Sequence, residues 1–148
     1  MKEYILAIGS DHRGFEQKEY IKAQFRVADA WVTWLDQGAY NDERSDYPIF
    51  AQKVAQAVQK GDALGGVLLC GTGAGMAIVA NRFGGIYAGL VWNEQTARMA
   101  KEHDNVNVLV LPSDFITPEQ ALEYVLVWFH ATFIAGEYQK RLDLIDTI

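Results

Sequence analysis

Residues 70–75, with the sequence Cys-Gly-Thr-Gly-Ala-Gly, join the chain's only cysteine to a glycine-rich turn. The apolar run 66–69 precedes them and is typical of a buried strand, and a helical segment is expected over 76–83. Glycines let a backbone approach a bound anion closely, and the N–H groups that open a helix point toward it. A thiol at such a turn can transfer a proton or attack as a nucleophile.

Two nucleotide-binding motifs do not fit this turn. Met76 stands where the dinucleotide fingerprint needs a third glycine, and no Gly-Lys-Ser/Thr follows as in a P-loop. A glycine-rich turn without any chemistry is one alternative, and a small buried cysteine is another. The combination of thiol and turn favours a chemical role.

Other candidates for chemistry follow or precede the expected strands and helices. Asp11 and His12 come directly after the first apolar strand, at the edge where open α/β sheets bind ligands. Asp11 could instead cap the next helix, whereas His12 titrates near neutrality and can exchange protons or hold a hydroxyl. Tyr47 could hydrogen-bond a ligand hydroxyl or simply pack. His103 ends a helix, where a histidine can be no more than a favourable partner for the helix dipole.

These residues require an α/β fold to position them. Strand-like and helix-like segments alternate along the chain, which predicts a single domain over residues 1–148 with a doubly wound, parallel, five-stranded sheet in a three-layer α/β/α arrangement. The expected strands are 4–9, 31–35, 64–69, 87–91 and 107–111. The expected helices are 15–25, 48–60, 76–83, 94–103, 117–133 and 137–145.

The helix expected over 117–133 is strongly apolar. Thr117 and Gln120 form a capping-box pattern at its start. Its apolar residues fit core packing, but they also fit a subunit interface, because small α/β chains rich in aromatic residues often pair through a helix.

Composition narrows the class of protein. The chain has 148 residues, half of them hydrophobic, and a net charge of −6, which argues against nucleic-acid binding. One cysteine permits no internal disulfide and fits a reducing cytoplasm. The N-terminal apolar run is short and is interpreted as a strand, and no membrane span is expected. Because no His, Cys and carboxylate spacing matches a metal site, neither metal nor cofactor is expected.

Four motifs together resemble the ribose-5-phosphate isomerase B family, which includes the galactose-6-phosphate isomerase subunits. They are Gly-Ser-Asp-His-Arg-Gly at 9–14, Asp-Tyr-Pro at 46–48, Cys-Gly-Thr-Gly-Ala-Gly-Met at 70–76 with Asn-Arg at 81–82, and His-Asp-Asn-Val-Asn-Val at 103–108. The resemblance covers nearly the whole chain. It implies a Rossmann-like or flavodoxin-like domain that works as a homodimer or homotetramer with active sites shared between subunits. It also implies metal-free isomerisation of an aldose or aldose phosphate through an enediolate, with ribose 5-phosphate and ribulose 5-phosphate as the default pair.

The resemblance also assigns roles to residues. Cys70 becomes the base that moves a proton between two carbons, and the amides that open the next helix favour its thiolate. Thr72 and the turn amides stabilise the enediolate. His103 of the partner subunit helps to open the sugar ring. The implied catalytic residues are Cys70, Thr72, His103 and Asp11; the implied substrate-binding residues are His12, Tyr47, Gly71, Gly73, Ala74, Gly75, Asp104 and Arg141.

The chain departs from the family pattern where the phosphate is expected to bind. Asp114 stands in place of an arginine after the last strand, and Glu137 replaces another near the C-terminus, so that Arg141 alone remains. Tyr87 also stands where an arginine is common, and Asp104 where asparagine is usual. Each lost charge-assisted hydrogen bond costs about 1.5–3 kcal/mol of binding. Either the substrate carries a different phosphate or none, or another cation has taken over: Arg13, Arg82 or Lys140.

These observations leave three classes of function to compare. An active isomerase for a sugar or sugar phosphate is favoured. A non-catalytic partner subunit of a heteromeric isomerase is the alternative, although such a subunit has no chemical need for Cys70, Thr72 and His103. A flavodoxin-like electron carrier fits poorly, because Asp11 places an acid where the flavin phosphate would bind.

Overall fold

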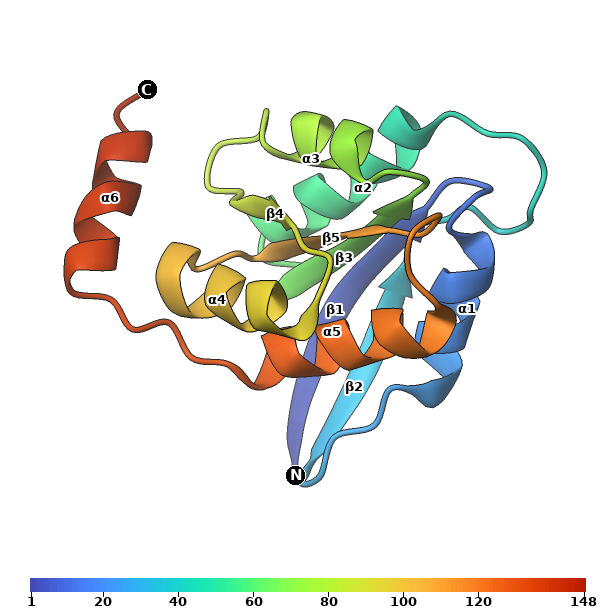
Figure 1. Cartoon of the computed structure of the whole chain (residues 1–148), viewed down its shortest axis with the longest axis horizontal. Coiled ribbons are helices and arrows are strands. Elements are labelled where there is room, and N and C mark those ends of the chain that lie inside the picture. Colours follow the sequence, from blue (N-terminus) through green and yellow to red (C-terminus); the bar gives the residue numbers. More distant parts are fainter.

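Five parallel strands form a sheet in the order β2-β1-β3-β5-β4, with helices covering both faces (Figure 1). This computed structural model describes all 148 residues. The strands are β1 (Lys2–Ser10), β2 (Ala30–Asp36), β3 (Gly65–Cys70), β4 (Ala88–Leu90) and β5 (Val108–Pro112). The helices are α1 (Phe15–Gln24), α2 (Tyr47–Gln59), α3 (Ala74–Ala80), α4 (Glu94–Asp104), α5 (Pro118–His130) and α6 (Glu137–Ile145).

The predicted doubly wound, three-layer architecture is confirmed, and each element begins and ends within three residues of its predicted bounds. The flavodoxin-like strand order 2-1-3-4-5 differs from this sheet only in the exchange of the last two strands. The exchange places β5 directly beside β3 and leaves β4 at the sheet edge. As a result, the loop that follows β5 lies next to the end of β3.

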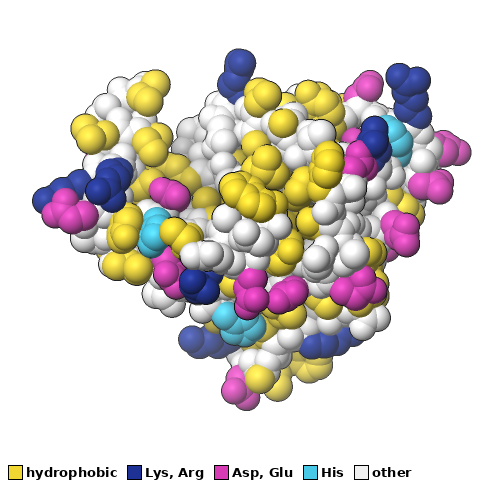
Figure 2. Space-filling view, in the orientation of Figure 1, with side chains coloured by type: hydrophobic (Ala, Val, Ile, Leu, Met, Phe, Trp, Pro, Cys, Tyr) yellow, Lys and Arg dark blue, Asp and Glu magenta, His cyan; other side chains and the backbone are white.

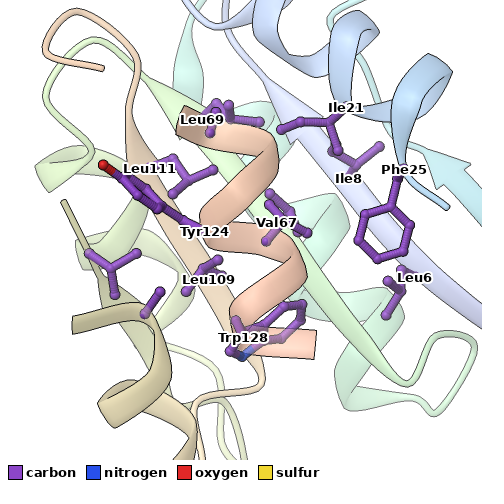
Figure 3. Close-up of a cluster of buried hydrophobic side chains, with 14 of the residues drawn as sticks. Leu6, Ile8, Ile21, Phe25, Val67, Leu69, Leu109, Leu111, Tyr124 and Trp128 are labelled. Atoms are coloured by element: carbon purple, nitrogen blue, oxygen red, sulfur yellow. The ribbon is translucent and has the colours of Figure 1, made fainter. Parts of the chain in front are cut away.

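Alternate side chains of the central strands supply two separate cores. On one face, Val67 and Leu69 of β3 pack under α1 and α5, where Tyr124 and Trp128 cover them (Figure 3). On the other face, Leu68 and Cys70 pack under α2 and α3. Strands β3 and β5 are buried along their whole length, as expected for strands covered on both faces. The thiol therefore belongs to the α2/α3 face.

Helix α5 contributes mainly to the core, which favours the packing interpretation of its apolar residues. Trp128 is 2% exposed, and its indole N–H donates to the carbonyl of Val106 at 2.8 Å. The predicted capping box of Thr117 and Gln120 is confirmed. The helix ends at His130 rather than near 133, because Ala131 takes an extended conformation.

Helix α6 lies beyond α4 at one end of the sheet (Figure 1), and its Leu142 is 2% exposed. An irregular segment, residues 131–136, leads to it, and the amide of Ile134 in this segment donates to the carbonyl of Glu102 at 3.0 Å. Hydrophobic side chains are visible on α6 in Figure 2. Leu144 of this helix is 69% exposed. No helix of the chain has the length and apolarity needed to span a membrane.

Candidate active site

The carboxyl ends of β1, β3 and β5 bring three loops together around Cys70. The amide of Asp11 donates to the carbonyl of Leu69 at 3.3 Å, on the β1 side of β3. On the β5 side, the amide of Ser113 donates to the carbonyl of Cys70 at 2.9 Å, and the amide of Asp114 donates to that of Gly71 at 3.0 Å. The predicted meeting of Asp11 with Cys70 at one sheet edge is therefore observed.

The turn after Cys70 needs glycine for steric reasons. Gly73 has a φ of +81°, and a Cβ atom there would lie 2.5 Å from Cδ1 of Leu90. The Oγ1 of Thr72 accepts a hydrogen bond from the amide of Ala74 at 3.2 Å. Thr72 is exposed, so its hydroxyl proton remains available to a ligand.

Cys70 is 5% exposed, and its thiol lies among backbone N–H groups. Burial raises the pKa of this thiol; hydrogen bonds from the amides of Met76, Gly73 and Thr72 lower it, and the Asp11 carboxylate raises it. The net pKa of Cys70 is above its ordinary value. The turn amides therefore lie where the sequence predicts and lower the pKa of Cys70, but the effect of burial on this pKa is larger.

Asp11 is buried and serves the turn into α1. Its Oδ1 accepts hydrogen bonds from the amides of Arg13 at 3.0 Å and Gly14 at 3.2 Å. The alternative that Asp11 caps the helix is therefore wrong: Gly14 is the N-cap of α1 and receives no side-chain cap, while Asp11 holds the turn before it. Because the same carboxylate raises the pKa of the Cys70 thiol, it also belongs to the electrostatics of the site.

His12 is held by a reciprocal pair of hydrogen bonds to Ser45. The amide of His12 donates to Oγ of Ser45 at 3.1 Å, and the amide of Ser45 donates to Nδ1 of His12 at 3.2 Å. Since Nδ1 accepts, a neutral imidazole carries its proton on Nε2. This leaves His12 with a donor for a ligand hydroxyl.

Tyr47 packs against the start of α3. A Cβ atom added to Gly75 would lie 2.4 Å from Cζ and 2.8 Å from Oη of Tyr47. The ring therefore occupies the space that a side chain at position 75 would need. Tyr47 is 37% exposed, so its hydroxyl can reach a ligand at the carboxyl edge while its ring packs.

A charged pair that the sequence reasoning did not recognise borders the turn. The guanidinium of Arg13 donates to the carboxylate of Asp114 through Nε, at 3.2 Å, and through Nη2. A Cβ atom at Gly71 would lie 2.9 Å from each partner, so the pair lies directly beside this glycine. The signal in the sequence is a pair of opposite charges, one after β1 and one after β5, the two strands that flank β3. The sequence alone indicates only that Arg13 can substitute for a missing cation and that Asp114 stands in place of an arginine.

His103, Asp104 and Arg141 lie away from this edge within the chain. Helix α4 runs from the end of β4 back to the start of β5, so its last residues, His103 and Asp104, lie at the opposite edge from Cys70. The His103 ring stacks on Tyr138 of α6, with centroids 4.4 Å apart and planes 6° apart. Arg141 lies with Cζ 5.5 Å from the centroid of the same ring. Within one chain, therefore, His103, Asp104 and Arg141 do not share a site with Cys70.

Hollows that lie away from Cys70 include one of about 640 Å³ lined by Met1, Tyr4 and Phe129 among others. No three His, Cys, Asp or Glu side chains lie close enough together to hold a metal ion.

Comparison with known proteins places this geometry in a known group. The family model Ribose/Galactose Isomerase matches residues 6–145. Ribose-5-phosphate isomerase B of Escherichia coli strain K12 is 38% identical over 143 residues, which is 97% of this chain and 95% of that protein. A ribose 5-phosphate isomerase structure from Thermotoga maritima matches with a TM-score of 0.91 and 41% identity, covering 98% of this chain and 99% of the other. Ribose-5-phosphate isomerase B from Mycoplasma genitalium with bound ribulose-5-phosphate matches with a TM-score of 0.88 and 38% identity, covering 99% and 96%.

Proposed function

The chain belongs to the Ribose/Galactose Isomerase family, and on that basis we propose that it interconverts an aldose phosphate and its ketose, with ribose 5-phosphate and ribulose 5-phosphate as the default pair. The observation that carries the proposal is the position of Cys70, between the Asp11 loop and a turn of N–H donors at the carboxyl edge of the sheet. Such donors are suited to an oxyanion that develops during reaction.

Isomerisation needs one base and a cradle for negative charge. The Cys70 thiolate removes the proton from C2 of the open-chain aldose, and the electron pair forms the enediolate whose oxygens face the turn amides and Thr72. The resulting Cys70 thiol then returns the proton to C1, while a proton passes from O2 to O1, which yields the ketose. Hydroxyls farther along the sugar meet His12 and Tyr47.

We further propose that two copies complete each site. His103 and Arg141 lie at the edge opposite Cys70, on a helix end and on the protruding α6, both suited to reach a second subunit. A homodimer, or a homotetramer built from it, would bring the imidazole of one subunit to the thiol of the other. A single cysteine and a small metabolite as substrate favour the cytoplasm.

A second candidate is an isomerase for a sugar with a relocated phosphate or none. The Arg13–Asp114 pair favours it, because Asp114 neutralises the nearest guanidinium and would repel a phosphate dianion. A hydroxyl-bearing sugar end can instead donate to the carboxylate and accept from the guanidinium. The non-catalytic subunit is disfavoured by the complete set of Cys70, Thr72 and turn amides.

Turnover by the purified protein tests both candidates. One panel holds aldose phosphates, beginning with ribose 5-phosphate, and the other holds free aldoses; Cys70→Ala is the control in both. Turnover of ribose 5-phosphate that the variant loses supports the first proposal. Turnover confined to free aldoses, or to an aldose with its phosphate at another carbon, supports the other. Silence on both panels contradicts an isomerase. Asp114→Asn separates the two further, since freeing Arg13 should lower KM for a phosphorylated substrate and raise it for a neutral one.

A further inference from the structure

Lys18 is a buried lysine with no assigned role. Its side chain is 0% exposed, and its Nζ donates to Oδ2 of Asp36 at 2.7 Å and to Oε2 of Glu19 at 2.8 Å. Lys22 contacts the same two carboxylates from the outside, at 2.6 Å and 3.2 Å. A buried ammonium costs several kcal/mol unless it is paired, and these two carboxylates supply the pairing.

Asp36 carries this interaction toward the active-site edge. While Oδ2 of Asp36 accepts from Lys18, Oδ1 accepts from the amide of Gly38 at 2.8 Å. Burial raises the pKa of Asp36, but hydrogen bonds from Lys18, Lys22 and the Gly38 amide bring the pKa below its ordinary value. Asp36 therefore stays charged and holds Lys18 on one oxygen and the turn on the other.

The same turn is bonded to the end of β1. The carbonyl of Gly38 accepts from the amide of Ser10 at 2.7 Å, and the carbonyl of Ser10 accepts from the amide of Ala39 at 2.7 Å. Ser10 directly precedes Asp11, whose carboxylate acts on Cys70. A continuous chain of hydrogen bonds thus links the buried ammonium to the strand end that carries Asp11.

Residues 37–46 extend this link to the other side of the site. Near their start, the Tyr40 hydroxyl donates to the carbonyl of Asp36 at 3.1 Å, and the Tyr40 ring lies 6.0 Å from Nζ of Lys18. Near their end, Ser45 is bonded to His12 in both directions, and Tyr47 follows at the start of α2. The loop is therefore anchored at one end by Lys18 with Asp36 and at the other by His12.

We propose that Lys18 is a positioning residue for the isomerase reaction. Through Asp36, its ammonium holds residues 37–46 against the end of β1, and this keeps three site residues in place at the carboxyl edge of the sheet: Asp11, His12 and Tyr47. The proposal rests on the proposed function, since it assigns these residues to an isomerase site. If Lys18 only stabilised the fold, its loss would not specifically release the turn that Asp36 holds.

The test compares Lys18→Met with two controls. Lys22→Met removes an ammonium that contacts the same carboxylates but is part-exposed, and Val125→Ala destabilises the core on α5 away from the site. All are assayed at a temperature where thermal melts show each fully folded. A misplacement of about 1 Å can cost roughly 100-fold in rate, so Lys18→Met should lower kcat/KM about 10- to 100-fold, mostly in kcat. Lys22→Met should stay within about threefold, and Val125→Ala should match the wild type per folded molecule.

Amide hydrogen exchange provides a readout that does not depend on activity. Exchange over residues 37–46 should accelerate in Lys18→Met and stay unchanged in Val125→Ala. If the wild type turns over no sugar, the proposed function fails, and the exchange measurement still decides whether Lys18 holds the loop. The positioning role is overturned if Lys18→Met keeps wild-type kcat/KM, or if its loop exchanges as in the wild type.

Lys18→Met could lose its fold, and Asp36→Asn then decides. Asparagine retains an oxygen for the Gly38 amide but loses the charge that holds Lys18. It should lower kcat/KM about fivefold or more and accelerate exchange of the loop, again with Val125→Ala as the control for stability. Wild-type values in both measurements would contradict the proposal.

Discussion

The two groups of site residues are held in very different ways. Cys70 and Asp11 are each 5% exposed and are locked by hydrogen bonds between neighbouring strand ends. His103 and Arg141 are held by aromatic and cation contacts to Tyr138, on a helix that stands off the sheet. The contrast teaches that a single chain holds Cys70 and Asp11, the residues proposed for proton transfer, in place by itself. Under our proposal, His103 and Arg141 act only in a site shared with another subunit.

The catalytic activity of the inner group, Cys70 and Asp11, should depend most on the Cys70 thiol. Cys70→Ala removes the base but leaves a small apolar side chain in a buried position, so folding should be preserved. Loss of a general base should reduce kcat about 100- to 10,000-fold. Steady-state kinetics beside a thermal melt checks this expectation. A variant that keeps a tenth of the activity would show that another group abstracts the proton.

Mixing subunits tests whether the outer group, His103 and Arg141, acts in the active site of another chain. Cys70→Ala and His103→Ala homodimers should each be nearly inactive. In a mixed dimer one site carries both defects and the other carries neither. Random mixing makes about half of the dimers mixed, so about a quarter of wild-type activity should return. No recovery after verified subunit exchange would place His103 and Cys70 in the same subunit's site, whereas an active His103→Ala homodimer would remove His103 from catalysis.

The contact between Gly75 and Tyr47 tests whether the position of the Tyr47 ring matters for activity. Gly75→Ala would place Cβ 2.4 Å from Cζ of Tyr47, so the ring must move. Displacement of a residue that holds substrate should cost about 10- to 100-fold in kcat/KM. Gly84→Ala is the matched control, because nothing lies within 4 Å of its added Cβ. If both variants behave alike, Tyr47 only packs.

The stack under His103 tests how the outer group is oriented. Tyr138→Leu removes the aromatic partner, whereas Tyr138→Phe keeps it. An aromatic pair contributes about 0.5–1.5 kcal/mol, so the leucine variant should lose about 2- to 10-fold in activity and the phenylalanine variant almost none. The NMR shifts of the His103 ring protons report the stack directly. Equal losses in both variants would point to the Tyr138 hydroxyl instead.

The smallest expected effect is on stability at alkaline pH. The pKa of Cys70 is raised in the folded chain, so the folded state binds this proton more tightly than the unfolded state. Its contribution to stability is therefore present below the ordinary thiol pKa and is lost as the pH rises through the folded value. Melting temperatures of wild type and Cys70→Ala, compared from pH 7 to pH 10.5, should show the wild type losing more above about pH 9. Parallel curves would mean that burial does not penalise the thiolate.

Much of the fold could be predicted because the signals are local. Alternating strand and helix patterns located all eleven elements, and Thr117 with Gln120 identified a helix start that the structure confirms. The Cys70 turn could also be recognised, since a strand, a thiol and glycines follow one another in the chain. The end of α5 was placed too late because apolar residues continue beyond His130, where the backbone is no longer helical.

The α/β architecture, the Cys70 turn and the resemblance to an isomerase family follow from the order of residues along the chain. The pairing of distant residues follows from the folded chain: Arg13 with Asp114, Lys18 with Asp36, and His103 with Tyr138. The folded chain also sets the direction of the Cys70 pKa shift, because the turn amides are local whereas burial comes from helices and strands far along the chain. Pairing and desolvation depend on distances in space, which local patterns do not contain.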